Sequence, residues 1–445
     1  MIMQTAGIVN AGKGLKCKDC KIIADIFLIL MKEKGPLLRA PENGIIKIQK
    51  HGDMEKSVMK TLIELYDERP IENVLGTEVF RPEETVFICP PEVAGDREMR
   101  RSLEAYFEHR GCPARVTFVQ SSLLDAVKVE KTLRRVLESR EDCAIDIAGG
   151  TDAALFAAGA VSGHTPVYTY SRKRNTFFEI KNAPFARNLA CSVRLDAASC
   201  FLMAGGELQP GRADNSVLKD KLPQIENLFT VYSAYRRIWN RQVSYFQKIS
   251  SAVDPDCAAC GKRTEKADHG QVTADEGLLR ALSEAELIRD LIFDDEKVSF
   301  RFADPQARFW LRDMGSVLEL QVYRACVLAN CFDDVVLSAV VNWRAGKKRD
   351  AVTNEIDVMA VCGVQPVFIS CKTCEIRTEA LNELAILRDR FGGKGSRAVI
   401  VTSAPGARGR TVMRQRAAEL GIEVIEWNDL PLDRLILRLK TRPND

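Results

Sequence analysis

Short apolar segments alternate with longer amphipathic ones between residues 58 and 170 of the chain. The apolar segments predict buried strands, namely Met59–Tyr66, Thr85–Cys89, Arg115–Val119 and Cys143–Ala148. The segments between them predict helices, namely Ile71–Phe80, Arg97–His109, Leu123–Leu137 and Ala153–Val161. Strands that alternate with helices favour a parallel sheet with right-handed crossovers and helices on both faces.

Two strand ends carry candidate ligand-binding residues, because ligands of parallel sheets collect at the carboxyl ends of the strands. Asp67–Pro70 follows the first strand, and Gly149–Asp152 follows the fourth strand and opens a helix. Paired glycines let the backbone approach a ligand closely, and Thr151 or Asp152 can cap a helix whose amides face a phosphate. A tight turn before a capped helix explains the pattern equally well. Neither a dinucleotide-binding fingerprint nor a P-loop is complete here.

The middle of the chain predicts a linker and a helical region. Ser171–Asn182 is basic and aromatic and predicts a hairpin or strand that closes the first domain, and a solvated edge strand guarded by lysine and arginine is the better-supported alternative. Cys200–Leu222 contains glycines and prolines typical of a hinge. Leu228–Ile249 predicts one helix, on which tyrosines, arginines and Trp239 could stack bases. Burial of these aromatic residues in a helix interface is the better-supported alternative.

The stretch Asn354–Cys374 predicts two buried strands joined by a turn. Side chains alternate between the two faces of a strand. Glu355 and Asp357 therefore share one face of the first strand, and Ser370 and Lys372 share one face of the second. The two strands would present carboxylates and a lysine at the rim of a sheet.

Upstream of these strands, Trp310–Tyr323 predicts one core helix that carries Glu319 among apolar residues. Each charge taken alone is most simply a solvated surface charge. Glu319, Asp357 and Lys372 together are more specific, because charges on largely buried elements need partners. Two carboxylates can hold a divalent metal on oxygen ligands while a lysine faces an attacking water or a phosphate.

The pattern after Lys372 predicts helix Thr378–Phe391, strand Ala398–Thr402, basic helix Gly409–Leu420 and strand Ile422–Ile425. The basic helix and the loop before it carry four arginines: Arg408, Arg410, Arg414 and Arg416. They could form a local basic groove for a phosphate backbone, or a solvated face.

The composition and net charge of the chain limit the classes of partner that it can bind. A chain of 445 residues, 46% hydrophobic and 28% charged, predicts a globular protein of two to three domains. The net charge of only +3 excludes a polycation that coats nucleic acid, so any nucleic-acid contact must be local. Ile22–Met31 is apolar but too short to span a membrane, and no signal-peptide cleavage pattern follows it. We therefore expect a cytoplasmic protein with no membrane partner.

The 14 cysteines are expected to be reduced, because the chain shows no export signal. Three pairs have Cys-x-x-Cys spacing: Cys17/Cys20, Cys257/Cys260 and Cys371/Cys374. Cys257 and Cys260, with nearby His269, are the best candidate for a partial zinc site, although zinc needs four ligands. Packing accounts better for Cys371 and Cys374.

The first 53 residues show no clear domain pattern, and no function is assigned to them. The pattern that predicts a domain begins around Met54. Translation that starts at Met54 or Met59 is therefore an alternative for the natural protein.

The residues around Glu319, Asp357 and Lys372 resemble the PD-(D/E)XK nuclease core. More narrowly, they resemble the nuclease module of CRISPR-associated effectors that cyclic oligoadenylates activate. The resemblance rests on a Gly-Ser-Val-Leu-Glu helix start and on Asn-Glu-Ile-Asp-Val and Phe-Ile-Ser-Cys-Lys-Thr strands. It implies metal-dependent cleavage of phosphodiester bonds, with Mg²⁺ or Mn²⁺ on Glu319 and Asp357. Lys372 would orient the nucleophile or neutralise charge in the transition state.

One position departs from the family pattern, because Ser370 stands where a carboxylate usually precedes the lysine by two residues. A hydroxyl is a weak, neutral metal ligand. Glu355, on the same strand face as Asp357, is the nearest candidate substitute. Lowered activity or a narrower choice of metal is the alternative.

The N-terminal pattern resembles the CRISPR-associated Rossmann-fold (CARF) sensor domain. The resemblance rests on the Asp-Glu-Arg-Pro-Ile-Glu-Asn, Val-Phe-Ile-Cys-Pro and Asp-Ile-Ala-Gly-Gly-Thr segments. It implies a homodimer that binds a cyclic oligoadenylate, with cyclic tetra-adenylate as the expected ring, across its two-fold axis. The implied ligand-binding residues are Asp67, Glu68, Arg69, Asn73, Gly149, Gly150, Thr151 and Asp152. Asp152 replaces a lysine that is frequent in the family, so Arg69 or Arg97 would meet the charge of the ring.

Residues 278–302 resemble the small winged-helix connector of this family, with a helix at Leu279–Ile292 and a wing strand at Lys297–Phe302. The resemblance implies a role in coupling. The predicted organisation of this α/β protein is an N-terminal extension (1–53), a CARF-like sensor (54–200), a linker with a winged-helix-like connector (201–303) and a PD-(D/E)XK nuclease domain (304–445).

The leading hypothesis is a metal-dependent endonuclease of CRISPR antiviral defence. It would cleave single-stranded DNA, RNA or both after a cyclic oligoadenylate binds at the sensor dimer. The alternative is a catalytically weak or dead regulator that binds nucleic acid through the winged helix, and Ser370 is its best support. A nucleotide-using enzyme of Rossmann type is disfavoured, because neither phosphate-loop fingerprint is complete.

Overall fold

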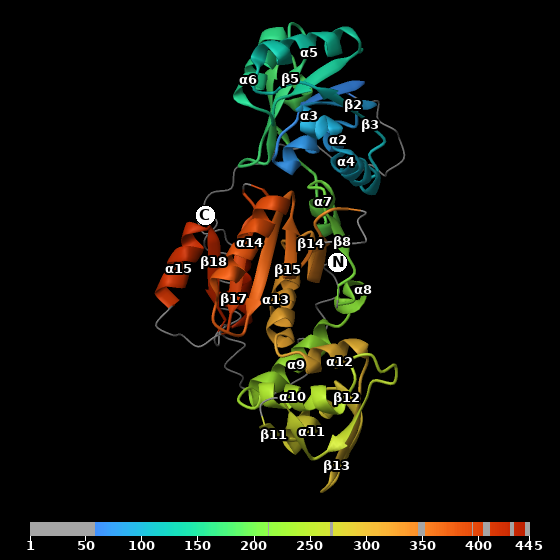
Figure 1. Cartoon of the computed structure of the whole chain (residues 1–445), viewed down its shortest axis with the longest axis vertical. Helices are drawn as coiled ribbons and strands as arrows, with labels where there is room; N and C mark the ends of the chain where they lie inside the picture. Colours follow the sequence, from blue (N-terminus) through green and yellow to red (C-terminus); the bar gives the residue numbers. More distant parts are fainter. Residues whose placement is uncertain are drawn as a thin grey trace, which may run out of the picture. The chain divides into compact units, whose positions relative to one another are not determined.

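The structure is a computed structural model that describes residues 58–211, 213–267, 270–345, 352–393, 395–403, 410–427 and 431–440 (Figure 1). The chain divides into two units, Met1–Glu55 and Lys56–Asp445, and all described residues belong to the second. The expectations for residues 1–53, Cys17/Cys20, His269 and Arg408 lie outside the described residues.

A seven-stranded sheet forms the N-terminal domain, in the order β3-β2-β1-β4-β5-β6-β7. Its strands are β1 (Thr61–Leu65), β2 (Glu84–Cys89), β3 (Arg115–Gln120), β4 (Cys143–Asp146), β5 (Val167–Ser171), β6 (Thr176–Lys181) and β7 (Leu189–Ala190). The first five strands are parallel, and β6 and β7 join antiparallel. The predicted parallel sheet is therefore confirmed. Ser171–Asn182 contributes β6, which forms a hairpin with β5 and lies between β5 and β7, so the edge-strand alternative is wrong.

Helices cover both faces of this sheet. They are η1 (Pro70–Asn73), α2 (Leu75–Phe80), α3 (Pro91–Gly95), α4 (Arg97–His109), α5 (Ala126–Glu138) and α6 (Asp152–Val161). Alternate residues of β1 enter opposite cores, because Leu62 packs in one cluster with Tyr106 of α4 and Ile63 in another with Leu133 of α5. Side-chain oxygens cap α4, α5 and α6, and Thr151 is the cap of α6, as expected.

The strand order reverses between β1 and β4 in the middle of the sheet. The chain runs from β1 to β2 on one side and from β4 to β5 on the other side. The loops that follow β1 and β4 therefore diverge, and such a switch point is where open α/β sheets bind ligands. Both candidate ligand-binding loops lie there.

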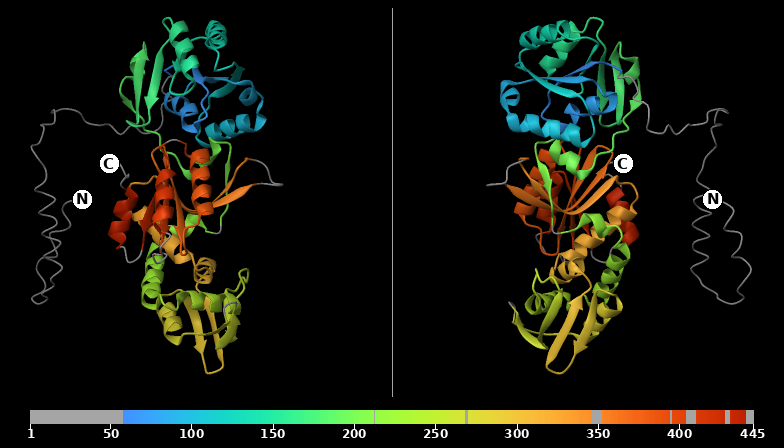
Figure 2. Two further views of the ribbon diagram at one scale, coloured as in Figure 1. Left: turned by 60° about the vertical axis from the view of Figure 1, so that its left-hand side comes forward. Right: turned by 90° about the vertical axis from the view of Figure 1, so that its right-hand side faces the viewer.

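A helical region with two small antiparallel sheets follows the N-terminal domain. Its elements are η2 (Pro184–Ala186), α7 (Ala197–Leu202), α8 (Asn215–Leu218), α9 (Leu222–Tyr235), α10 (Trp239–Ile249), β9 (Ala258–Lys262), β10 (Thr264–Ala267), β11 (Gly270–Thr273), α11 (Glu276–Glu284), β12 (Ile288–Phe293), β13 (Lys297–Phe302) and α12 (Pro305–Arg312). The strands pair as β12-β13-β9 and β10-β11. The β12–β13 hairpin is the yellow arm in Figure 2. The winged-helix description of this region stays a prediction.

Two predicted helices in this region were too long. The segment Leu228–Ile249 is divided between α9 and α10, and the segment Leu279–Ile292 ends as the strand β12. Glu286 has a φ of 58°, which ends α11, and β12 gains the hydrogen bonds of the hairpin with β13. Trp239 and Tyr245 are fully buried, so the packing interpretation of the aromatic residues is confirmed.

A six-stranded sheet forms the C-terminal domain, in the order β18-β17-β16-β15-β14-β8. Its strands are β8 (Glu207–Gln209), β14 (Asp334–Asn342), β15 (Thr353–Cys362), β16 (Gln365–Lys372), β17 (Arg397–Thr402) and β18 (Ile422–Glu426). Its helices are α13 (Ser316–Leu328), α14 (Thr378–Phe391), α15 (Arg410–Glu419) and α16 (Leu432–Lys440). Val358 and Ile369 pack with α13 on one face, whereas Phe368 packs with Leu384 of α14 on the other.

The predicted hinge at Cys200–Leu222 is anchored to this sheet. β8 pairs with β14 as an edge strand, and the side chain of Asn215 exchanges hydrogen bonds with the backbone of Leu337 at 2.8 and 2.9 Å. A Cβ on Gly211 would lie 2.0 Å from the backbone oxygen of Ser338, so only glycine permits this approach. None of the helices in the described part of the chain is long and apolar enough to cross a membrane.

Candidate active site

The predicted helix Trp310–Tyr323 is broken into α12 and α13, and the break places Glu319 in the first turn of α13. Asp313 causes the break, because its Oδ1 accepts the backbone N–H of Gly315 at 3.1 Å. The side chain of Glu319 therefore lies at the amino end of a buried helix, beside Gly315.

Asp357 lies at a gap in the hydrogen-bonding ladders of the C-terminal sheet. β14 and β15 pair on either side of Ser338 and Asp357 but not at these two residues. The ladder between β15 and β16 ends one residue short of Asp357, at Val358 and Ile369. Ser338 has a φ of 51°, a left-handed conformation that interrupts β14 opposite Asp357. The gap leaves backbone groups of β16 available to a side chain.

The carboxylate of Asp357 takes the place of a backbone partner in this gap. Its Oδ2 accepts the backbone N–H of Cys371 at 2.6 Å and the hydroxyl of Ser370 at 3.1 Å. The Nζ of Lys372 lies 3.6 Å from the same oxygen. Three successive residues of β16 therefore fix the orientation of one carboxylate.

Glu319 is electrostatically coupled to this carboxylate. Burial raises the pKa of Glu319 to about 8, and the negative charge of Asp357 is the next largest cause. Asp313 and Glu355 raise the pKa further, and Lys372 lowers it. Glu319 is therefore close enough to Asp357 and Lys372 to feel the charge of both, and Asp357 and Lys372 are in direct contact.

Ser370 and Glu355 also lie at this site. Asp357, Ser370, Lys372 and Glu355 line one small cavity of about 50 Å³ beside α14. The Ser370 hydroxyl donates to Asp357, so it acts here as a support for a carboxylate. Glu355 is exposed and contributes negative charge at Glu319, so its role as a substitute ligand stays a prediction.

The donor set fits a hard divalent cation in charge and chemistry. Carboxylate oxygens are the ligands of Mg²⁺ and Mn²⁺, and a cation between Glu319 and Asp357 would relieve the repulsion that raises the pKa of Glu319. Among the described residues, no group of three or more His, Cys, Asp or Glu side chains is arranged to hold a metal. Two carboxylates leave the remaining positions to water, which Mg²⁺ commonly retains.

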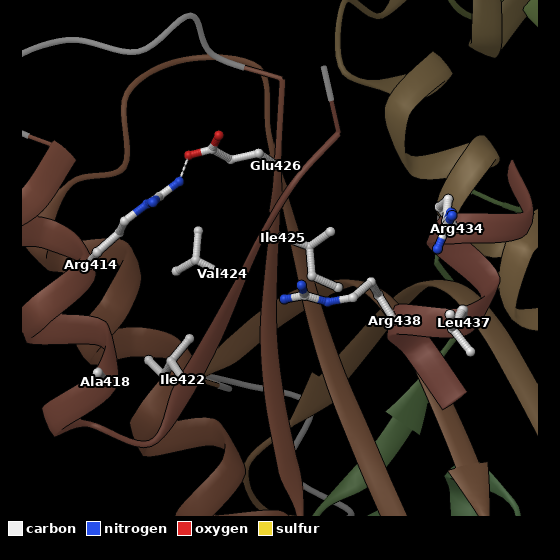
Figure 3. A pocket seen from close by; sticks show the side chains of 9 residues that line it. All are labelled: Arg414, Ala418, Ile422, Val424, Ile425, Glu426, Arg434, Leu437 and Arg438. Carbon is white, nitrogen blue, oxygen red and sulfur yellow. Dashed lines mark ion pairs between the residues drawn. The ribbon is translucent and has the colours of Figure 1, made fainter. Parts of the chain in front are cut away.

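The predicted basic groove is present only in part. Arg414 of α15 lines a pocket of about 640 Å³ over the edge strand β18, with Arg434 and Arg438 of α16 (Figure 3). Arg414 forms an ion pair with Glu426, and Arg438 lies 3.2 Å from Glu423. Carboxylates thus neutralise two of the three guanidinium groups.

Asp67 joins the two candidate ligand-binding loops of the N-terminal domain. Its carboxylate accepts hydrogen bonds from the Arg69 side chain at 2.8 Å and from the backbone N–H of Gly150 at 3.0 Å. Burial alone would raise the pKa of Asp67, but the bonds from Arg69 and Gly150 outweigh it, and the pKa is lowered. Asn73 ties the same loop through two bonds to the backbone of Asp67, at 2.9 and 2.7 Å.

Local packing requires glycine at positions 149 and 150, whether or not a ligand binds there. A Cβ on Gly149 would lie 2.8 Å from the Cβ of Asp67, and a Cβ on Gly150 would lie 2.8 Å from that of Leu65. Gly150 also has a φ of 94°. The glycines therefore permit the close approach of the β4 loop to the end of β1.

The other predicted ligand-binding residues differ in their surroundings. The Thr151 hydroxyl caps α6 and donates to the backbone oxygen of Leu123, so it is already engaged. Glu68 and Asp152 are exposed at the two loop ends. The structure places all eight predicted ligand-binding residues in the two segments that follow β1 and β4, with Asn73 in η1 and Asp152 at the start of α6. Their roles stay predictions.

A buried acidic cluster below these loops was missed at the level of sequence. Glu64 of β1 and Asp146 of β4 are paired neighbours in the sheet, and each is 1% exposed. Burial raises the pKa of both, and that of Glu64 is further raised by Asp146. A Cβ on Gly76 would lie within 2.8 Å of both carboxyl groups and of the Tyr168 hydroxyl. Acidic residues inside two apolar strands were the available signal.

Comparisons with known proteins agree with the resemblance seen in the sequence. Residues 306–442 match the family model described as the Card1-like endonuclease domain. No curated protein sequence matches the chain. The sequence-based recognition of a nuclease domain of this kind is therefore confirmed.

Solved structures are similar over most of the chain. Protein VC1899 from Vibrio cholerae has a TM-score of 0.65 at 19% identity, and the match covers 85% of this chain and 96% of that chain. Can2 from Sulfobacillus thermosulfidooxidans, in complex with cyclic tetra-adenylate, has a TM-score of 0.59 at 15% identity, covering 86% and 96%. At these identities the matches establish the fold alone, and they confirm the predicted mixed α/β architecture.

Proposed function

We propose that this protein is a metal-dependent nuclease that a cyclic oligoadenylate activates. The observation that carries the proposal is the fixed carboxylate of Asp357, with Lys372 at 3.6 Å and the repelling carboxyl of Glu319 beside it. The match of the C-terminal domain to Card1-like endonuclease domains supports the reaction type. The substrate would be single-stranded DNA, RNA or both, and the setting would be CRISPR antiviral defence in the cytoplasm.

The roles of the residues follow from their contacts. Glu319 and Asp357 would hold Mg²⁺ or Mn²⁺, which when bound polarises a phosphoryl oxygen and lowers the pKa of a water. Lys372 is placed to orient the nucleophile or to neutralise charge on the phosphate in the transition state. Ser370 and the backbone of Cys371 hold Asp357 in one orientation, so they position the carboxylate.

The loops at the switch point of the N-terminal sheet would bind the phosphates of the cyclic oligoadenylate. The switch-point loops lie at the carboxyl ends of β1 and β4, and Can2 has the same fold in complex with cyclic tetra-adenylate. Arg69 offers a positive charge there, although Asp67 partly neutralises it. Binding of the ring would shift the nuclease from one conformation to the other only if the ring has different affinities for the two conformations.

Exposed apolar side chains support a homodimer through the sensor. Leu124, Val127 and Phe156 are 83%, 75% and 75% exposed, and they lie on α5, α6 and the loop before α5. These elements are adjacent, because Thr151 at the start of α6 bonds to Leu123. Apolar side chains exposed on neighbouring helices are typical of an interaction surface.

The test is cleavage of labelled single-stranded DNA and RNA in Mg²⁺ or Mn²⁺, with and without cyclic tetra-adenylate. We expect cleavage only with both metal and activator, and a loss of at least about a hundredfold in Lys372→Ala. Lys297→Ala, an exposed lysine on β13, is the matched control and should cleave normally. Cleavage that Lys372→Ala leaves unchanged would remove the assignment of the site.

A second candidate function is a regulator that binds nucleic acid without turnover. The observation that favours it is Ser370, which supplies a hydroxyl to Asp357 where the family has a further carboxylate. It predicts binding of duplex without product in either metal, and full retention of binding after Asp357→Asn. Product formation in the wild type decides against it.

A further inference from the structure

A groove in the connector leads to the candidate active site. It has a volume of about 650 Å³ and lies between the end of α10 and the helix α12. Its lining includes Gln247, Gln306, Arg308, Phe309, Arg312 and Asp313. We name it the connector groove.

The connector groove ends beside Glu319. Asp313, its last residue, precedes Gly315, and a Cβ on Gly315 would lie 3.1 Å from Glu319 Oε1 and 3.8 Å from Asp313 Oδ1. Asp313 is also one of the charges that raise the pKa of Glu319. A ligand that extends from the groove past Asp313 would therefore approach the carboxyl group of Glu319.

Two arginines in the groove are held close together without a counter-ion. Arg308 donates to the backbone oxygen of Asp254, and Arg312 donates to that of Ser250 at 3.3 Å. Both partners are neutral. Among the described residues no ion pair includes Arg308 or Arg312, although the carboxylate of Asp313 also lines the groove. Burial lowers the pKa of Arg312, and the positive charge of Arg308 lowers it further. The Nε of Arg312 is buried and has no partner among the described residues.

Fixed like charges that no carboxylate neutralises favour an anion. The pocket over β18 provides the contrast, because there Glu426 neutralises Arg414 (Figure 3). In the same pocket Glu423 neutralises Arg438. The anion that a nuclease brings to such a groove is a phosphate backbone. Phe309 is only partly buried and lies next to Arg308, and an aromatic ring beside cations is typical of sites that stack unpaired bases.

We propose that the connector groove binds the backbone of a single-stranded nucleic acid and directs it to Glu319 and Asp357. This inference rests on the proposed nuclease function and assigns substrate binding to a domain expected only to couple sensor and nuclease. Arg308 and Arg312 contact two phosphates, Phe309 stacks one base, and the strand continues past Asp313. A duplex offers no unpaired base to Phe309 and binds less tightly.

The test is equilibrium binding of a labelled single strand to the full chain in EDTA, measured by anisotropy over a series of salt concentrations. Loss of two phosphate contacts should lower the slope of log affinity against log salt by about 1.4 in the double variant Arg308→Gln/Arg312→Gln. Arg308→Lys/Arg312→Lys keeps both charges and should keep most of the slope. Arg289→Ala, an exposed arginine on β12, is the matched control and should bind as the wild type does.

The outcomes separate this inference from the proposed function. A folded double variant with wild-type affinity and slope overturns the groove, as does equal binding of duplex and single strand by the wild type. If the double variant melts early, Gln247→Glu replaces it, and its added negative charge should weaken binding several-fold. Normal groove variants alongside an inactive Lys372→Ala would refute the groove and leave the nuclease assignment standing. If the groove variants bind weakly while Lys372→Ala stays active, the groove stands and the assignment of the nuclease site is refuted.

Discussion

Replacement of Glu319 by glutamine tests whether this carboxyl is held in place at an electrostatic cost. The pKa of Glu319 is raised from 4.5 to about 8. A carboxyl with a raised pKa in the folded state contributes its full stability below its unfolded pKa and loses it as the pH rises through the folded value. The wild type should therefore lose stability relative to Glu319→Gln between about pH 4.5 and pH 8.

The size of the effect follows from the same shift. At pH 7 the unfolded carboxyl is ionised and the folded one is still mostly protonated, which linkage converts to about 3 kcal/mol. At pH 5 the same difference is about 1 kcal/mol. Partial exposure of Glu319 and its place at the amino end of α13 both reduce the cost of its charge, the latter by about 0.3–1 kcal/mol. We expect glutamine to stabilise the domain by about 2 kcal/mol at pH 7 and less at pH 5.

The assay is hydrogen exchange of peptides from α13, measured by mass spectrometry in EDTA at both pH values. Local exchange is preferred because a chain of several domains does not unfold in one two-state step. Glu379→Gln is the matched control, because Glu379 is also in the first turn of a helix, α14, but is exposed. It should change little at either pH.

Added Mn²⁺ should make the wild type more stable than Glu319→Gln. A ligand that binds only the folded state at a hundred times its Kd stabilises it by about 2.7 kcal/mol, and the glutamine variant lacks one of the two carboxylates. The reasoning is refuted if Glu319→Gln and the wild type exchange alike at pH 7 in EDTA, or if their difference is the same at pH 5.

Three further predictions concern single residues at the two sites. Ser370→Asp adds a further carboxylate next to Asp357 and should tighten Mn²⁺ binding roughly tenfold, as measured by calorimetry. Unchanged or weaker Mn²⁺ binding would contradict this prediction. Gly76→Ala should destabilise the sensor domain by about 1–3 kcal/mol in hydrogen exchange, because its Cβ meets three polar atoms at 2.6–2.8 Å. Arg69→Ala should weaken binding of fluorescent cyclic tetra-adenylate by about tenfold at an unchanged melting temperature, because Asp67 then carries an unpaired charge next to the ring. Unchanged affinity would remove Arg69 from the proposed ring site.

Much of the fold was predictable because local pattern and tertiary packing agree. The strands β1, β2 and β4 are buried on both faces, so they read as continuous apolar runs, and α4 begins at a capping aspartate. Where local and tertiary preferences differ, prediction failed. Trp310–Tyr323 has an unbroken apolar pattern, but Asp313 and Gly315 stop one helix and start another. The sequence of β12 taken alone predicts a helix, and the segment forms a strand because it pairs with β13.

The composition of the candidate site was predictable, but its geometry was not. Strand periodicity places Asp357 and Lys372 on one face, because that depends only on neighbours in the chain. The gap that turns Asp357 toward Cys371 depends on Ser338, on a strand that the sequence does not identify as its neighbour. The anchoring of the predicted hinge by β8 is equally non-local, because three residues carry no periodic signal.

The two unusual charge groupings in the C-terminal half of the chain are complementary. Burial and the charge of Asp357 both disfavour an ionised Glu319, and burial and the charge of Arg308 both disfavour a charged Arg312, so each grouping costs stability in the free protein. Only the three residues Asp313, Met314 and Gly315 separate the helix with the arginines from the helix with Glu319. A metal with a bound phosphodiester strand would supply a cation to the first pair and anions to the second. Both costs would then be relieved together, which is why a single ligand explains them better than two unrelated structural roles.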